Sequence, residues 1–280
     1  LAARSPPRGY FRVDERARAR AMSMIWDDGV RVLVALTGPA AGSCAALLAD
    51  RLPRGEPVVM ARSRCRSCGA VLRWYELVPV VSWLAQRGRC RHCGAPVPGR
   101  LVQAELVGLL FGLGAAILAP TPVAALLAAL FLWCLLALAL ADLRFFRLPD
   151  PLTAALAVLG VALMLAGDGT GWPEWPDRLV ASALGALAGG GSFLALRLGY
   201  RLITGREGMG LGDVKLMAGI GAGLGVAALP VVTLLAGVSA LVVAGLRACR
   251  RGRGLRRAGR VPFGAFLALA AAVVWLLPLV

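Results

Sequence analysis

Two acidic residues of this apolar chain have positions that would allow them to do chemistry together. Asp213 stands in the run Gly208-Met-Gly-Leu-Gly-Asp213-Val-Lys215 at the start of a long apolar segment, and Asp142 ends another. An ionisable group deep in lipid costs on the order of 2 to 3 kcal/mol, so such a group is expected to have a partner and a function. Two adjacent carboxylates can activate water as a general acid and base pair. Alternatively, Asp213 has no catalytic role and only stabilises the first turn of a helix, where an acid interacts favourably with the helix dipole.

The residues around Asp213 extend this candidate site. Gly210 and Gly212 allow a backbone to approach closely. Lys215 could keep the neighbouring carboxylate ionised or contact a substrate. It could equally be a cation at the lipid headgroups.

Four cysteines form a second candidate site in a hydrophilic stretch. They occur as two pairs, Cys65-Arg-Ser-Cys68 and Cys90-Arg-His-Cys93. Each pair lets two thiolates reach one ion, and four thiolates complete the tetrahedral shell of a structural zinc ion. Two disulfides or a redox pair would need an oxidising compartment. We therefore predict zinc, which would supply much of the folding free energy of so small a module.

The only histidine, His92, lies inside the second cysteine pair, where it could replace one cysteine as a ligand. No other histidine remains for a His-based zinc hydrolase or a Ser-His-Asp triad. Any hydrolysis would therefore depend on carboxylates. Cys44, Cys134 and Cys249 lie in or beside apolar runs and are predicted to pack there.

The elements that must position these groups are membrane helices. The chain has 280 residues, 59% of them hydrophobic, which is too apolar for a soluble domain. We predict an all-α polytopic membrane protein with about eight transmembrane helices. The predicted spans are residues 30–49, 101–119, 122–141, 152–166, 179–203, two spans within 216–246 that separate near Pro230, and 261–280.

The charges sort by side of the membrane, so the net charge of +16 does not indicate nucleic acid. Residues 50–100 hold ten arginines, whereas the predicted outer loop, residues 167–178, carries only Arg178. The positive-inside pattern places the cysteine pairs and both aspartates, Asp142 and Asp213, on the cytoplasmic face. We predict a cytoplasmic zinc-binding module at 50–100 and a transmembrane core at 101–280.

The first residues break this pattern, because residues 1–21 contain six arginines upstream of a helix that begins outside. We expect residues 1–24 to be a disordered basic extension, with Met22 or Met24 nearer the functional start. The alternative is a basic tail held inside, which would require an odd number of spans or a re-entrant segment.

The order of these motifs resembles that of the bacterial type IV prepilin peptidases. The resemblance runs from about residue 35 to the end of the chain. It rests on Gly42-Ser43, Arg51-Leu-Pro53, the two cysteine pairs, Glu105, Asp142 to Pro149-Asp150, Gly210-Leu-Gly-Asp213-Val-Lys215 and Val261-Pro-Phe-Gly264. A four-cysteine insert combined with a GxGD aspartate makes the match specific.

The resemblance implies an inner-membrane aspartyl endopeptidase with two activities. Such enzymes remove the basic leader of type IV prepilins or type II secretion pseudopilins on the cytoplasmic side, just before an apolar helix. They then methylate the new N-terminus from S-adenosylmethionine. The family aspartates map onto Asp142 and Asp213, with Asp150 as the rival of Asp142 because it is also placed to cap the next helix.

The chemistry of the residues agrees with this mechanism. One ionised aspartate would take a proton from water while the other, protonated, polarises the scissile carbonyl. Because two close carboxylates share a proton, activity is expected to be bell-shaped in pH.

Some residues depart from the family pattern near the methyl-transfer half. Cys44, Ala45 and Ala46 follow Gly-Ser where an aromatic residue and an asparagine are expected, and the residues before Glu105 lack a tyrosine and a proline. Glu105 is the candidate for S-adenosylmethionine binding, with a helix-start charge as the simpler interpretation. The alternatives are a peptidase without methyl transfer, a zinc-containing membrane transporter or scaffold, and a GxGD protease for ordinary transmembrane substrates.

Overall fold

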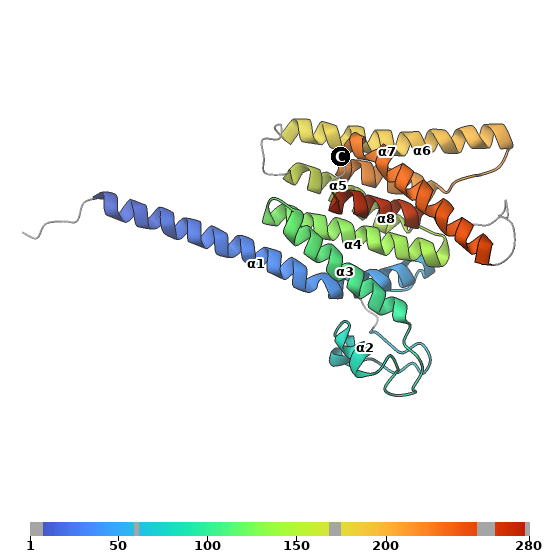
Figure 1. The fold of residues 1–280 in the computed structure, drawn as a ribbon, viewed down its shortest axis with the longest axis horizontal. Helices are drawn as coiled ribbons and strands as arrows, with labels where there is room; N and C mark the ends of the chain where they lie inside the picture. The colour runs from blue at the N-terminus through green and yellow to red at the C-terminus, as the bar shows by residue number, and fades with distance from the viewer. Residues whose placement is uncertain (1–7, 59–61, 168–174, 251–260, 278–280) are drawn as a thin grey trace, which may run out of the picture.

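The described part of the chain is a bundle of helices. The computed structural model describes residues 8–58, 62–167, 175–250 and 261–277, and within these ranges it contains no regular strand (Figure 1). The helices are α1 (Arg8–Arg51), α2 (Val81–Ala85), α3 (Gly99–Leu118), α4 (Pro122–Phe145), α5 (Asp150–Ala166), α6 (Trp175–Thr204), α7 (Leu211–Arg250) and α8 (Phe263–Leu276), with the 3-10 turns η1 (Leu52–Arg54) and η2 (Trp74–Leu77). The predicted all-α polytopic class is confirmed.

Five helices are long and apolar enough to cross a membrane: α1, α3, α4, α6 and α7. The helices α5 and α8 are apolar but shorter. The predicted spans 30–49, 122–141, 152–166 and 179–203 each lie within one helix, and 101–119 lies within α3 but for its last residue. Of the span 261–280, α8 covers residues 263–276, and 278–280 lie outside the described residues.

The long helix α7 is two helices joined at a sharp bend. Gly225 has φ 76° and ψ 175°, which interrupts the helix. A Cβ at Gly189 of α6 would lie 2.5 Å from the Met217 carbonyl oxygen and 3.5 Å from the Leu229 side chain. In a straight helix these two residues would be about 18 Å apart along the axis, so the chain folds back.

The prediction of two spans in this region therefore agrees with the fold, but the predicted break at Pro230 was wrong. Pro230 lies inside the second half of α7. Proline fixes φ near the helical value, whereas the reversal needs a positive φ, which glycine adopts without a steric penalty.

Small residues bring neighbouring helices into close backbone contact. A Cβ at Gly42 of α1 would lie 2.1 Å from the Ala104 carbonyl oxygen of α3, and one at Gly185 of α6 would lie 2.1 Å from the Gly221 carbonyl oxygen of α7. Close backbone packing of this kind drives helix association in membranes, because the hydrophobic effect does not draw helices together within lipid.

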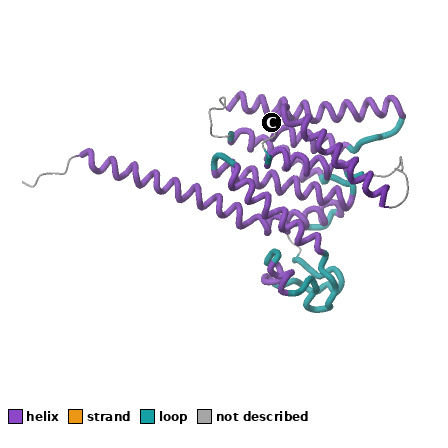
Figure 2. Tube along the Cα trace, in the orientation of Figure 1, coloured by secondary structure: helices purple, strands orange, loops and turns teal. Residues whose placement is uncertain are grey.

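The first helix is longer than expected. It begins at Arg8, so residues 8–24, expected to be disordered, are helical, and residues 1–7 lie outside the described residues. In Figure 1, α1 extends beyond the rest of the bundle at the end opposite the four-cysteine segment. That segment is mostly loop and turn, whereas the rest is helix (Figure 2). The physical reason is that residues 8–24 contain neither a proline nor a pair of glycines, so no residue in this stretch interrupts the helix.

The helix α4 lies at the centre of the bundle. In its most apolar 18-residue window, 67% of the residues are buried inside the protein, against 22–39% for the other four long helices. The other helices expose large apolar side chains such as Leu187 and Leu241, which would contact lipid. A side chain at the end of α4 is therefore held by the best-packed element of the molecule.

Candidate active site

The two predicted aspartates meet at the start of α8. Asp142 lies in the last turn of α4 and is 6% exposed, and Asp213 lies in the first turn of α7. A Cβ added at Gly264 would lie 2.9 Å from Asp213 Oδ1 and 3.1 Å from Asp142 Oδ2. The carboxylates of Asp142 and Asp213 therefore face the same point beside Gly264.

The backbone fixes the orientation of both carboxylates. Asp142 Oδ2 accepts a hydrogen bond of 2.8 Å from the N–H of Ala265, the third residue of α8. Asp142 thus satisfies a free N–H at the helix start, which the N-terminal cap Pro262 does not do. Asp213 contacts the backbone of Gly210, where the helix α7 begins.

The ends of the helices set these positions. The chain leaves α4 through Phe146, whose φ of 52° is left-handed and whose N–H donates to the Asp142 carbonyl oxygen at 2.9 Å. Leu148 follows, and its side chain would lie 3.0 Å from a Cβ at Gly212 and 2.9 Å from one at Gly264. The two glycines therefore leave room for Leu148 beside the carboxylate pair.

Asp150 and Lys215 pair with each other rather than with the central carboxylates. Lys215 Nζ lies 2.6 Å from Asp150 Oδ1, with side chains that are 50% and 74% exposed. The expected cap at Asp150 is absent, because Pro149 occupies the cap position and no side chain caps α5. The possibility that Lys215 keeps Asp213 ionised has no described contact in its support, because the described partner of Lys215 is Asp150. Asp150 lies outside the pair.

The four predicted cysteine ligands come together in space. Their sulfur atoms all lie within 4.8 Å of one another, and the Sγ atoms of Cys65 and Cys93 are 3.9 Å apart. In a tetrahedral zinc site with Zn–S bonds of 2.3 Å, sulfur atoms are about 3.8 Å apart. None of the described cysteines forms a disulfide. The residues therefore fit a four-coordinate zinc ion.

The two cysteine pairs are built as the same turn. Gly69 and Gly94 follow them with φ of 72° and 70°, and their N–H groups each donate at 2.9 Å to the carbonyl oxygens of Cys65 and Cys90. The N–H groups of Cys68 and Ser67 lower the pKa of Cys65 to about 6. A low pKa favours the thiolate, which is the form that binds metal.

Glu105 lies in α3 and reaches across to the cysteine segment. It is 8% exposed, and its Oε2 accepts a 2.7 Å hydrogen bond from the N–H of Val80. Val80 has a φ of 59°, a strained backbone conformation for a β-branched residue. Because Glu105 is the seventh residue of α3, it is not a first-turn charge.

A cavity of about 1220 Å³ lies between α1, α3 and the cysteine segment. Its lining includes the acids Asp50 and Glu105, the aromatic Trp83 and the cation Arg144. Arg144 is two residues beyond Asp142 on α4, and it lines the cavity whereas Asp142 does not.

Several residues of these sites were not singled out by sequence reasoning. Leu148 and Ala265 carry no chemical group that marks them, and Asp50 stands next to Arg51-Leu-Pro53 without a motif of its own. Gly264 belonged to the resemblance only as part of the start of the last span. The one signal that could have found Asp50 is an acid among the many arginines of residues 50–100.

The fold and the site define a polytopic membrane protein with a carboxylate pair at helix ends and a separate four-cysteine module. Two family models match the chain: the bacterial peptidase A24 N-terminal domain at residues 36–118, and the type IV leader peptidase family at residues 129–245. Gly264 and α8 lie outside both matched segments.

Curated relatives match over most of the chain. A prepilin leader peptidase/N-methyltransferase of Burkholderia pseudomallei is 40% identical, over 80% of this chain and 69% of the relative. Proteins of the same name from Aeromonas hydrophila and Dichelobacter nodosus are 37% and 35% identical, over 78% and 76% of this chain and 73% and 70% of the relatives. No solved structure matches the chain. The chain belongs to the type IV leader peptidase family and is a membrane enzyme.

Proposed function

We propose that this enzyme cleaves the basic leader of type IV prepilins or type II secretion pseudopilins with Asp142 and Asp213. The observation that carries the proposal is the meeting of these two carboxylates at Gly264, at the ends of two membrane helices. The relatives at 35–40% identity are named for the same activity. The substrate would be an apolar helix that lies in lipid with a basic leader at its end, and the acidic pair suits that charge.

The pair would divide the work of hydrolysis. One ionised aspartate takes a proton from water, and the water oxygen attacks the scissile carbonyl carbon. The other aspartate, protonated, donates a hydrogen bond to the carbonyl oxygen.

The distribution of charge supports a proposal for the side of the membrane on which the site lies. Residues 50–100 carry ten arginines, and Arg144 lies in the last turn of α4 together with Asp142. Because arginine-rich loops stay inside, we place the site and the cysteine module on the cytoplasmic face of the inner membrane. Part of the basic segment 247–261 lies outside the described residues.

The experiment is cleavage of a prepilin with a basic leader by purified protein in detergent, scored by product mass. Asp142→Asn and Asp213→Asn should each lose about a hundredfold or more in rate, because general acid–base catalysis contributes that much. Asp150→Asn is the matched control and should still cut, because its side chain pairs with Lys215.

The asparagine variant also separates chemistry from capping. Asparagine can still accept the hydrogen bond from Ala265 N–H, so Asp142→Asn should keep its unfolding temperature while activity is lost. If Asp142→Asn and Asp213→Asn cut at the wild-type rate, the carboxylate mechanism is wrong. If the wild type cuts no prepilin, the assigned substrate is wrong.

We further propose that the cavity beside Glu105 binds S-adenosylmethionine and that the same enzyme methylates the new N-terminus. The names of the relatives support this second activity. The cavity volume, the carboxylate of Glu105 and the ring of Trp83 suit a cationic sulfonium with an adenine ring. Glu105→Gln should keep cleavage and lose the methyl group in the product mass. A product of Glu105→Gln that is fully methylated would remove Glu105 from this role.

We assign a structural zinc ion to Cys65, Cys68, Cys90 and Cys93, where it would close the two turns of the module. In this organisation, residues 50–100 form the metal module and residues 101–280 the protease core. The module would hold one wall of the cavity, and the core would hold the carboxylate pair.

A further inference from the structure

Asp50 is a buried acid at the end of α1 that the proposed chemistry does not use. It is the penultimate residue of α1 and is 5% exposed. A carboxylate buried to this degree is destabilising unless cations and hydrogen bonds compensate it. The contacts of Asp50 therefore indicate what this position stabilises.

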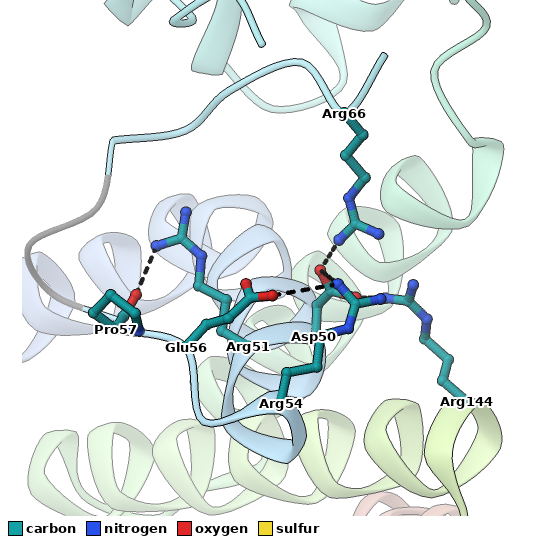
Figure 3. A network of polar contacts seen from close by, with 7 residues as sticks. All are labelled: Asp50, Arg51, Arg54, Glu56, Pro57, Arg66 and Arg144. Carbon is teal, nitrogen blue, oxygen red and sulfur yellow. Dashed lines mark hydrogen bonds and ion pairs between the residues drawn. The ribbon is translucent and has the colours of Figure 1, made fainter. Parts of the chain in front are cut away.

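Three guanidinium groups from three different segments converge on this carboxylate (Figure 3). Arg144 of α4 lies 2.6 Å from Oδ1, and Arg54 of η1 lies 3.5 Å from Oδ2. Arg66 of the cysteine module forms an ion pair with the same Oδ2.

The positions of two of these arginines connect the two sites of the molecule. Arg66 lies between Cys65 and Cys68, inside the first metal-binding turn. Arg144 is two residues beyond Asp142, in the last turn of α4. Asp50 is thus the one group in contact with both the metal turn and the end of the helix that carries Asp142, among the described residues.

The attachment of the module makes this contact important. Among the described elements, η2 and α2 pack mainly against each other, and neither packs closely against α4 or another long helix. The module is joined to the helices by side chains, through Glu105 to Val80 on one side and through Asp50 to Arg66 on the other. Removal of the Asp50 charge would leave Arg66 and Arg144 facing each other, with repulsion in place of attraction.

We propose that Asp50 is a positioning residue that couples metal binding by the cysteine module to the placement of Asp142. A metal ion that holds Cys65 and Cys68 fixes the turn that carries Arg66, and Asp50 transmits this constraint to Arg144. By linkage, the constraint acts equally on the free energy of metal binding, so Asp50 strengthens the binding of the metal. We expect the weaker binding of a variant without this contact to appear as faster metal release. The effect on cleavage rests on the proposed function, whereas the effect on metal retention does not.

The test measures two quantities on the full-length holoenzyme in detergent. One is the half-time for transfer of zinc to a chromophoric chelator, and the other is kcat and KM for prepilin cleavage. Asp50→Asn and Arg66→Gln should each shorten the half-time about fivefold or more and lower kcat more than KM changes. Arg66 is 54% exposed, so Arg66→Gln carries the test if Asp50→Asn does not fold.

The controls separate coupling from a general loss of charge. Arg54→Gln removes a cation that contacts Asp50 from only four residues away, so it joins no distant segments and should leave both quantities within about twofold. Asp50→Glu keeps the negative charge, so its zinc-transfer half-time and its cleavage kinetics should both be close to those of the wild type. The double variant Asp50→Asn with Arg66→Gln should release zinc no faster than either single variant, because both remove the same contact.

Zinc release at the wild-type rate from folded Asp50→Asn and Arg66→Gln overturns the proposal. Additive effects of the two substitutions overturn it as well. If the wild type retains zinc in an Asp50-dependent way but cuts no prepilin, the proposed function fails and the coupling to the module stands.

Discussion

At the scale of single residues, the carboxylate pair depends on a residue without a side chain. Gly264 stands where the oxygens of Asp142 and Asp213 both converge. We expect two acids that face one point to share one proton, because acid and base roles in one site require it. Leu148 covers the same position from the loop after α4.

We predict that Gly264→Ala lowers kcat/KM by about tenfold or more, because a methyl group there would contact both carboxylates at 3.1 Å or less. Gly191→Ala in α6 is the matched control, since its Cβ would contact nothing within 4 Å. Steady-state cleavage of a prepilin peptide measures the effect. Equal activity of the two variants would show that the space beside Gly264 is not needed.

The pH dependence of kcat/KM should be bell-shaped. At low pH both carboxylates are protonated and no base remains, and at high pH both are ionised and no acid remains. The measurement is a pH profile of the wild type and of Asp150→Asn, which should have the same shape because Asp150 pairs with Lys215. A profile without an acidic limb would contradict a carboxylate base.

At the scale of elements, the turn at Gly225 decides which face of α7 meets α6. Gly185 and Gly189 of α6 contact both halves of α7 through backbone atoms and Leu229. The fold of this hairpin places Asp213 at the start of its first half. The geometry of the candidate site therefore depends on a bend at the far end of the same half of α7.

We predict that Gly225→Ala lowers the free energy of unfolding by about 1 to 3 kcal/mol, because its φ of 76° and ψ of 175° are open almost only to glycine. Pro230→Ala should not lower stability, because proline inside a helix is itself unfavourable. Thermal unfolding in one detergent compares the two. A larger loss of stability in Pro230→Ala than in Gly225→Ala would favour the helix break at Pro230 that the sequence predicts.

At the scale of the whole molecule, two sites share one end of the helix bundle. The carboxylate pair belongs to α4, α7 and α8, whereas the cavity beside Glu105 has the cysteine module as one wall. Arg144 lines the cavity and lies in the last turn of α4, two residues beyond Asp142.

Removal of zinc with a chelator should therefore affect the two activities unequally. We expect methyl transfer to be lost, because the module forms part of that cavity, and cleavage to fall by a smaller factor. The mass of the product reports both, and added zinc should restore both. Cys134→Ala is the control, since Cys134 is buried in α4 away from the metal ligands. An equal fall in both activities would mean that the module supports the whole bundle.

The sequence by itself determined the helical membrane class, the four cysteine ligands and the two candidate acids. These features depend on local composition and spacing: apolar runs long enough to span lipid, two CxxC pairs, and acids at the ends of such runs. The same local signals placed the break in α7 at the wrong residue and predicted disorder where α1 is helical. Proline and arginine content does not determine the backbone conformation that the packed structure adopts.

Only the tertiary structure decided which groups meet. Asp142 and Asp213 lie 71 residues apart in the sequence, and they come together with Gly264 because three helix ends converge there. The partner of Lys215 is Asp150, and the partners of Asp50 come from η1, α4 and the metal turn. Such pairings depend on how helices cross, and crossing is set by small-residue contacts between distant segments that a single sequence does not pair.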